Sequence, residues 1–372
     1  MVINRCCLST VTIRSKALAL ALACGVTAIV SNALLVIVSP VALGQVIPGG
    51  APRSNLEQQL DIPLNNGIQG EERDQADLLL RVGGQAQQQG NFEKAIANWL
   101  QAIDLYQRVG DTEALGLTYD YLGVAYAKSG LYQQAEDALR RRVGIARTRQ
   151  DFQGQIYGLN NLGTVLLQAR NVQAARASFT EALRIARSIK NREAEGLSLS
   201  NLGLAAAAGG NYLEAIKYDE AALNLRSFSG NPLGEANTRN NLADAYRAVN
   251  LPKEALLSYQ SALSLAQGSR DIPNQYRGLR GLTQSYSTLG EYGAALKVLE
   301  QHLALSQKEK NRAEELISLR LAAGIYKATG NLLNARRLYE EAIALAGALG
   351  DMQEAALLRN DLAQVLYYRK SN

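Results

Sequence analysis

The chain has few of the residues on which most enzyme sites depend. Its three cysteines all lie within the first 24 positions, and His302 is its single histidine. Beyond Cys24 neither a disulfide framework nor a thiolate metal site can form, and no site can use two imidazoles. The sequence also shows no Ser/His or Cys/His set, and no phosphate-cradling glycine loop in a strand–turn–helix setting. We therefore expect no enzyme, no cofactor and no metal.

The chain also has little net charge. The formal net charge is +5, and Arg5, Arg14 and Lys16 are the charged residues of the first 44 positions. Without that segment the net charge falls to +2. Binding of nucleic acid usually requires a concentrated basic face. We therefore expect no nucleic-acid partner.

The N-terminal segment has the pattern of an export signal. Three basic residues precede an apolar run from Ala17 to Val38, and small residues follow at Ala42 and Gly44. This pattern predicts a secretory signal peptide over residues 1–44, cleaved before Gln45. The alternative is an uncleaved N-terminal anchor, because residues 17–38 are long enough to span a bilayer. Both interpretations place the rest of the chain outside the cytoplasm, in the periplasm or secreted.

Residues 45–70 are rich in proline and glycine and lack periodicity, so we interpret them as a flexible linker. Beyond this linker an acidic or amide residue recurs every forty positions. The members of this column are Asp111, Asp151, Asn191, Asn231, Asp271, Asn311 and Asp351. The column divides residues 71–372 into seven full repeats (71–110, 111–150, 151–190, 191–230, 231–270, 271–310 and 311–350) and a half repeat, 351–372. A period of this length predicts a solenoid, in which each unit buries its apolar face against its neighbours.

Each repeat carries the pattern of two amphipathic helices. In the unit from Asp111, apolar and small residues follow one another at spacings of three and four on both sides of Gly130. Glycine or asparagine is expected where the first helix ends, because both tolerate a left-handed backbone. This turn column consists of Gly90, Gly130, Asn171 (one place late), Gly210, Asn250, Gly290 and Gly330.

Small and bulky residues alternate at fixed offsets. The first helices carry Gly83, Gly123, Gly163, Gly203 and Ala243, and the second helices carry alanine from Ala95 to Ala335. The bulky column of the second helices contains Trp99, Leu139, Phe179, Tyr259, Leu299 and Tyr339. These columns resemble the tetratricopeptide repeat, in a longer-helix subclass similar to that of kinesin light chain. HEAT and armadillo units also have about forty residues, but they lack the Leu-Gly-x-x-Tyr and Gly-x-Tyr-x-x-Ala patterns seen here at residues 122–126 and 130–135. The resemblance implies an all-α fold, a right-handed superhelical solenoid of antiparallel helical hairpins.

Three residues depart from this template. Asp219 occupies the bulky column, and Arg142 and His302 occupy a column that is otherwise alanine. A buried aspartate or arginine is costly unless it is paired. We therefore expect these second helices to be rotated or frayed locally, with Tyr218 replacing Asp219 inside. His302 is expected to be a structural histidine.

The resemblance implies a concave groove, lined by the first helices, that binds peptides. The residues expected there are Asn160, Asn161, Asn201, Asn240, Asn241, Asp244, Arg277, Arg280 and Arg320. Asn161, Asn201 and Asn241 form one column, whose amides could hold the backbone of an extended peptide. The arginines suit a carboxylate. Asparagine is a poor helix former, so its repetition requires a reason.

We therefore expect a non-catalytic scaffold, exported from the cytoplasm, that binds a protein or peptide partner in this groove. Membrane contact is expected only through the N-terminal segment if that segment is not cleaved. The alternative is a structural protein without a defined groove ligand, which self-associates if Tyr367 or Tyr368 faces outward. The sequence leaves both open.

Overall fold

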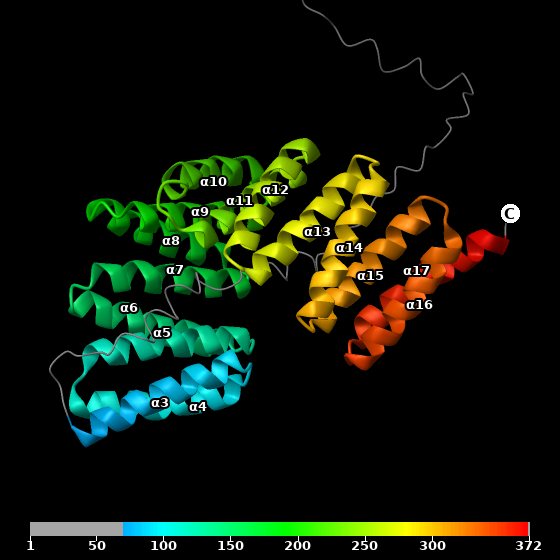
Figure 1. Cartoon of the computed structure of the whole chain (residues 1–372). Coiled ribbons are helices and arrows are strands. Elements are labelled where there is room, and N and C mark those ends of the chain that lie inside the picture. Colours follow the sequence, from blue (N-terminus) through cyan, green and yellow to red (C-terminus); the bar gives the residue numbers. More distant parts are fainter. Residues whose placement is uncertain (1–69, 371–372) are drawn as a thin grey trace, which may run out of the picture. The chain divides into compact units, whose positions relative to one another are not determined.

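A computed structural model describes residues 70–370, which form fifteen α-helices and no strand (Figure 1). This architecture confirms the all-α prediction. The predicted signal and, apart from Gly70, the linker lie outside the described residues. The first helices of the hairpins are α3 (Glu71–Gln88), α5 (Thr112–Lys128), α7 (Phe152–Gln168), α9 (Arg192–Ala208), α11 (Pro232–Ala248), α13 (Ile272–Thr288), α15 (Arg312–Ala328) and α17 (Met352–Lys370). The second helices are α4 (Phe92–Val109), α6 (Tyr132–Thr148), α8 (Val172–Ser188), α10 (Tyr212–Arg226), α12 (Pro252–Gly268), α14 (Tyr292–Lys308) and α16 (Leu332–Ala348).

The recurring acidic or amide residue caps the N-terminus of a first helix. Asp111 accepts a hydrogen bond from the backbone N–H of Ala114 at 3.0 Å, and Asp151 accepts one from Gly154 at 2.8 Å. The other members of the column bond in the same way, each to the residue three positions on. Such a cap is worth about 1 kcal/mol. The forty-residue period therefore marks where each repeat begins.

The turn within each hairpin has a left-handed residue where the sequence predicts one, with one exception. Gly130 has φ 76° and Asn250 has φ 62°. In the third hairpin the left-handed residue is Arg170, with φ 62°, and not Asn171. Asn171 instead caps α8 by accepting a hydrogen bond from the N–H of Ala174 at 3.2 Å. The prediction that Asn171 is the turn residue of this hairpin was therefore wrong. Arg170 is the turn residue, and it lies in register with the rest of the turn column.

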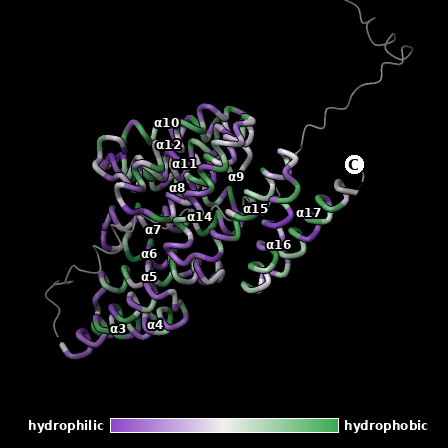
Figure 2. Tube along the Cα trace, turned by 45° about the vertical axis from the view of Figure 1, so that its right-hand side comes forward, coloured by the Kyte–Doolittle hydropathy of each residue, from purple (hydrophilic) through white to green (hydrophobic). Residues whose placement is uncertain are grey.

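The small and bulky columns pack against each other inside each hairpin. A Cβ added to Gly163 would lie 2.7 Å from Cδ1 of Phe179, and one added to Gly123 would lie 2.6 Å from Cγ of Leu139. Glycine is therefore required where the large side chain crosses the first helix. Along the helices hydrophobic and hydrophilic positions alternate, as expected for amphipathic segments (Figure 2).

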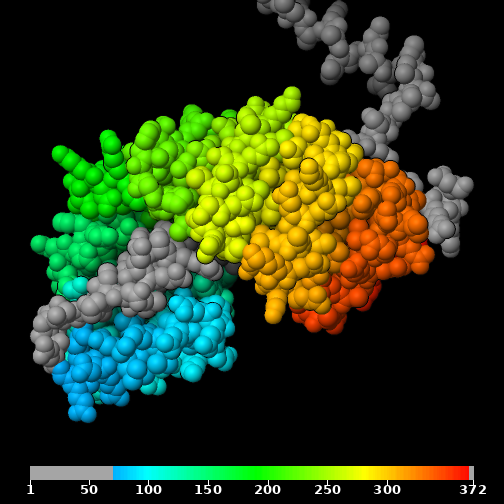
Figure 3. Space-filling view, in the orientation of Figure 1, coloured from blue at the N-terminus to red at the C-terminus, as the bar shows by residue number. Residues whose placement is uncertain are grey.

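Each second helix also packs against the first helix of the next repeat, from α4 against α5 to α16 against α17. The space-filling view shows the repeats following one another in chain order (Figure 3). Burial therefore continues from repeat to repeat, as expected for a solenoid.

Asp219 takes the bulky position itself, contrary to the predicted exchange with Tyr218. Its side chain is 1% exposed and Tyr218 is only half-buried. A Cβ on Gly203 would lie 2.7 Å from Oδ1 of Asp219, so the carboxylate occupies the place that Phe179 fills one repeat earlier. Oδ1 has no hydrogen-bond partner. Burial raises the pKa of Asp219 well above its ordinary value, and nearby Arg277 and the hydroxyl of Ser200 oppose this shift only in part.

Arg142 and His302 stay inside intact helices, so the expected fraying is not observed there. Arg142 lies 3.3 Å from Asp151, and glycines at 154 and 158 leave space for its side chain. His302 is fully buried, and its Nε2 lies 2.9 Å from Oε2 of Glu314. Pairing with a carboxylate offsets the cost of burying each side chain.

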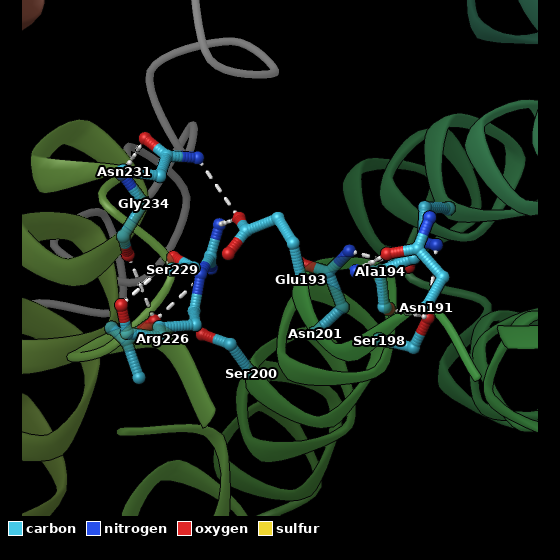
Figure 4. Close-up of polar contacts among 12 residues, drawn as sticks. Asn191, Glu193, Ala194, Ser198, Ser200, Asn201, Arg226, Ser229, Asn231 and Gly234 are labelled. Atoms are coloured by element: carbon cyan, nitrogen blue, oxygen red, sulfur yellow. Dashed lines mark hydrogen bonds and ion pairs between the residues drawn. The ribbon is translucent and has the colours of Figure 1, made fainter. Parts of the chain in front are cut away.

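A fourth departure was missed in the sequence. Arg226 occupies a column that is alanine at 146, 186, 266 and 346, and it is 1% exposed. Its Nη2 lies 2.9 Å from Oε1 of Glu193, which also accepts a hydrogen bond from Asn231 (Figure 4). Gly196 and Gly234 leave space for the guanidinium. The helix α10 ends at Arg226 after 15 residues, although α8 and α12 have 17.

Candidate functional site

In the central repeats the first helices of neighbouring units contact one another directly. The helix α5 contacts α7, α7 contacts α9, α9 contacts α11 and α11 contacts α13. Across residues 70–370 no two second helices make a comparable contact. The first helices from α5 to α13 therefore form a continuous surface. We call it the first-helix face, and it comprises the positions of Leu117, Asp120, Tyr121 and Val124 in α5 and their equivalents forty residues apart.

The asparagine column lies in this face and joins one first helix to the next. Three hydrogen bonds from Nδ2 atoms repeat at the same offset: Asn161 to Asp120 (2.8 Å), Asn201 to Asn160 (2.8 Å) and Asn241 to Ser200 (3.1 Å). Asn160, Asn201, Asn240 and Asn241 are no more than 8% exposed, and Asn161 is half-buried. The repetition of asparagine thus has a structural reason. Its role in holding a peptide stays a prediction.

A second polar cluster lies on α11 and α13. Nη2 of Arg277 lies 2.6 Å from Oδ2 of Asp244, and Nη1 donates to Oδ1 of Asn237 at 3.2 Å. The hydroxyl of Tyr259 also donates to Asp244. Burial alone would raise the pKa of Asp244, but the charges of Arg277 and Arg247 outweigh it and lower that pKa below its ordinary value. This carboxylate is therefore ionised and already bound.

The other two arginines predicted to bind a ligand also hold internal carboxylates. Nη1 of Arg280 lies 2.8 Å from Oε1 of Glu314, whose other oxygen contacts His302. Nη1 of Arg320 lies 2.9 Å from Oε1 of Glu354. A ligand carboxylate would have to compete with these ion pairs. The proposed binding of an acidic peptide by Arg280 and Arg320 also stays a prediction.

The structure shows an apolar part of this face that the sequence analysis did not single out. Half-buried Leu117, Tyr157 and Leu197 follow one another in α5, α7 and α9. Seven positions later in the same helices lie half-buried Val124, Thr164 and Leu204. We call these six residues the apolar stripe, because five have aliphatic or aromatic side chains and the hydroxyl of Thr164 donates within its own helix to the carbonyl of Asn160 at 2.9 Å. Residues seven apart lie on the same side of a helix. The equivalent positions in α11 and α13 are Asn237, Asp244, Arg277 and Gln284, so the stripe ends where the polar cluster begins.

This arrangement offers side-chain contacts and hydrogen bonds. Within residues 70–370 no three His, Cys, Asp or Glu side chains gather closely enough to hold a metal ion. Over the same residues no helix has both the length and the apolar character of a bilayer span. The apolar stripe offers apolar contacts, and the polar cluster offers hydrogen bonds and charge.

Comparison with protein families gives consistent matches along the described residues. A family model described as tetratricopeptide repeat matches residues 74–148, 155–226 and 194–268. A second model with the same description matches residues 279–313. These matches cover more than half of the chain. No curated protein gave a significant match.

Three solved structures illustrate the similarity of this fold to known proteins. A signal transduction ATPase with a tetratricopeptide repeat sensor from Pyrococcus horikoshii is 19% identical (TM-score 0.58), and the match covers 77% of this chain and 44% of that protein. The apo form of RapI is 15% identical (TM-score 0.55; 74% and 99% covered). The Rap conjugation gene regulator of plasmid pLS20, in complex with the Phr* peptide, is 16% identical (TM-score 0.55; 81% and 84% covered). This chain thus spans less than half the length of the ATPase. At these identities the comparisons show the fold alone.

Proposed function

The chain belongs to the tetratricopeptide repeat family, and we propose that it is an exported, non-catalytic scaffold whose first-helix face binds a peptide segment of a partner protein. The observation that carries this proposal is the apolar stripe. Its side chains are only half-buried, although they lie within helices whose Leu122, Leu162 and Leu202 are buried. Such a row can take up apolar side chains of a bound peptide.

Two further observations support the proposal. The polar cluster of Asp244 and Arg277 continues the face beyond the stripe, so a peptide could meet apolar contacts first and polar contacts next. Among proteins of similar fold, two Rap structures are described as complexes, one with the Phr* peptide and one with Competence and Sporulation Factor. Those ligands belong to those proteins. They support a peptide as the class of partner for this fold.

A peptide library selected on the purified protein tests this function. Peptides enriched on the wild type are synthesised with a fluorophore, and their affinity is measured by fluorescence anisotropy. The double variant Leu197→Glu, Leu204→Glu places two charges in the apolar stripe of α9. Each lost leucine contact is worth about 1.5–3 kcal/mol, so we expect affinity to fall by at least about tenfold.

The matched control is Leu213→Glu, Leu257→Glu. These leucines are 69% and 70% exposed and lie on the second helices α10 and α12. The control variant should bind the selected peptides within about twofold of the wild type, a change of less than ~0.5 kcal/mol. An equal loss of affinity in both variants, or no enriched peptide, would contradict binding at the first-helix face.

The asparagine column needs a different design, because Asn161, Asn201 and Asn241 join first helices. Replacing all three by alanine should weaken binding and also lower the melting temperature. The peptide-clamp interpretation requires a loss of affinity that persists at a temperature where hydrogen exchange shows the variant still folded.

Export is part of the proposal and rests on the N-terminal sequence. A fusion of residues 1–60 to alkaline phosphatase should be active only if the segment crosses the cytoplasmic membrane. N-terminal sequencing of the mature protein distinguishes a signal cleaved before Gln45 from an uncleaved anchor. An inactive fusion would overturn export without affecting the peptide-binding proposal.

Self-association is a second candidate function, favoured by one observation. Tyr367 on α17 is 74% exposed, as the self-assembly alternative requires. Light scattering after size-exclusion chromatography decides. A monomer at micromolar concentration would remove this candidate.

A further inference from the structure

Positive charge is concentrated in one part of the chain. Residues 131–192 contain eleven Lys or Arg and four Asp or Glu, a net charge of +7, although the whole chain has +5. Residues 193–370 contain nineteen of each sign, and residues 71–130 are net negative. The modest net charge of the whole chain therefore hides a basic segment that spans repeats two and three.

Nine of the eleven cations lie on the second helices α6 and α8 or on the loops that follow them, while Arg170 follows α7 and Arg192 begins α9. Seven of these nine are exposed: Arg140, Arg141, Arg147, Arg149, Arg184, Arg187 and Lys190. We call this set the basic surface. It lies on different helices from the first-helix face. Cations are favoured at helix C-termini by the helix dipole, but α12 and α16 carry no basic residue in their last turns. The dipole alone does not account for the basic surface.

A pocket of about 200 Å³ opens within the basic surface. Arg140 and Arg147 of α6 and Glu181 of α8 lie at its sides, and Val143, Leu159 and Leu162 form its floor. Nη2 of Arg147 lies 2.8 Å from Oε1 of Glu181, and Nη2 of Arg140 lies 2.7 Å from Oε1 of Glu136. Carboxylates are therefore the anions that these guanidinium groups already hold.

We propose that the basic surface is a docking site for an acidic segment of a partner protein, one with carboxylates around an aliphatic side chain. Carboxylates would pair with Arg184 and Lys190, which make no ion pair within residues 70–370, and would compete with Glu181 for Arg147. The aliphatic side chain would enter the pocket over its apolar floor. The apolar floor of the pocket suits an aliphatic side chain, which the sugar-phosphate backbone of nucleic acid does not offer. The occupant is therefore an acidic protein segment. This inference concerns a second surface and does not depend on peptide binding at the first-helix face.

The probe for the test is a fluorescein-labelled synthetic peptide of repeated Glu-Glu-Leu triplets. Its control has Gln-Gln-Leu triplets. Anisotropy with the full chain should show binding of the glutamate peptide that weakens steeply as NaCl rises, and at least tenfold weaker binding of the glutamine peptide. The variant Arg147→Glu, Arg184→Glu should weaken binding at least tenfold. It should also gain affinity for a Lys-Lys-Leu peptide, which a variant that merely misfolds would not do.

The matched control is Arg336→Glu, Arg337→Glu. These two exposed arginines lie on the second helix α16, and the change alters the net charge equally. The proposal requires wild-type affinity for the glutamate peptide in this control and in Leu197→Glu, Leu204→Glu. A loss in the α16 variant would mean that net charge alone attracts the peptide, and a loss in the α9 variant would place it on the first-helix face. Tighter binding of duplex DNA or of phosphatidylglycerol vesicles than of the peptide would also overturn the assignment.

Discussion

Replacing Asp219 by leucine should stabilise the protein at neutral pH. Asp219 is buried with one oxygen unpartnered, at a position where repeats two and six carry Leu139 and Leu299. Leu139 packs over Gly123 as Asp219 packs over Gly203, so a leucine side chain fits this geometry. The neighbouring cations keep other partners, since Arg277 is bound to Asp244 and Arg226 to Glu193.

The magnitude follows from two effects. Burying a leucine side chain contributes about 1.5–3 kcal/mol, and well-packed apolar residues in place of buried ionic groups raise stability by up to ~1–4 kcal/mol. We therefore expect Asp219→Leu to raise the free energy of unfolding by roughly 1–4 kcal/mol. Thermal denaturation followed by circular dichroism measures the effect, and slower hydrogen exchange of amides in α9 and α10 locates it.

The pH dependence gives a second readout with a definite sign. Burial raises the pKa of Asp219 in the folded protein above its unfolded value. The folded state therefore binds the proton more tightly, and the wild type loses stability as pH rises from the unfolded pKa, near 4, through the raised one. Below pH ~4 the group is protonated in both states, so the advantage of Asp219→Leu should shrink there. The variant Asp219→Asn isolates the effect of charge.

The reciprocal change provides the control for position. Leu139→Asp introduces the same carboxylate into repeat two and should destabilise by roughly 3–5 kcal/mol, because it removes a buried leucine and adds an unpaired charge. The reasoning is refuted if Asp219→Leu melts below the wild type at pH 7. It is also refuted if the difference between the two proteins does not change between pH 4 and pH 7.

Three further changes test the packing and polar contacts described above. Asn201→Ala leaves the buried Oδ1 of Asn160 without its donor and should destabilise by about 1–3 kcal/mol, with faster hydrogen exchange in α7 and α9; unchanged exchange would contradict the role of this bond. Gly163→Ala forces Phe179 out of its position and should cost ~1–3 kcal/mol, measured by chemical denaturation, whereas Gly144→Ala, with open space around it, should be tolerated. Trp99→Ala removes a fully buried side chain that stacks on Tyr121 at 5.6 Å between ring centroids, so it should cost about 3–5 kcal/mol, and a loss below 1 kcal/mol would contradict its place in the core.

The fold could be predicted because its determinants repeat. Most small and bulky residues recur forty positions later, so a single interpretation is supported by several repeats along the chain. The prediction was less accurate where one unit differs. Asn171 caps a helix and is not the turn residue. The left-handed conformation belongs to Arg170, a residue type that does not by itself predict a turn. Arg226 was missed since its accommodation depends on glycines 196 and 234, which belong to two other helices.

The candidate site could be predicted only in part. The sequence placed the asparagines and arginines on the first helices, as observed. It could not show that Asn201 bonds to Asn160 of the preceding repeat, or that Arg277 holds Asp244, because both contacts join residues more than thirty positions apart. The apolar stripe was missed because Leu197 and Leu204 have the same residue type as core leucines. Leu197 and Leu204 are half-buried because of the side chains that the stacking of repeats brings near them.

The sequence by itself determined the repeat length, the pairing of helices and the apolar columns of this protein, because these depend on local periodicity and on side-chain size. Only the tertiary structure decided which polar residues are available to a partner. Burial and ion pairing depend on the neighbouring repeat, and a residue's own repeat does not encode its neighbour's contacts. The charge excess of residues 131–192 is present in the sequence, but only the structure shows that α6 and α8 lie on either side of one pocket.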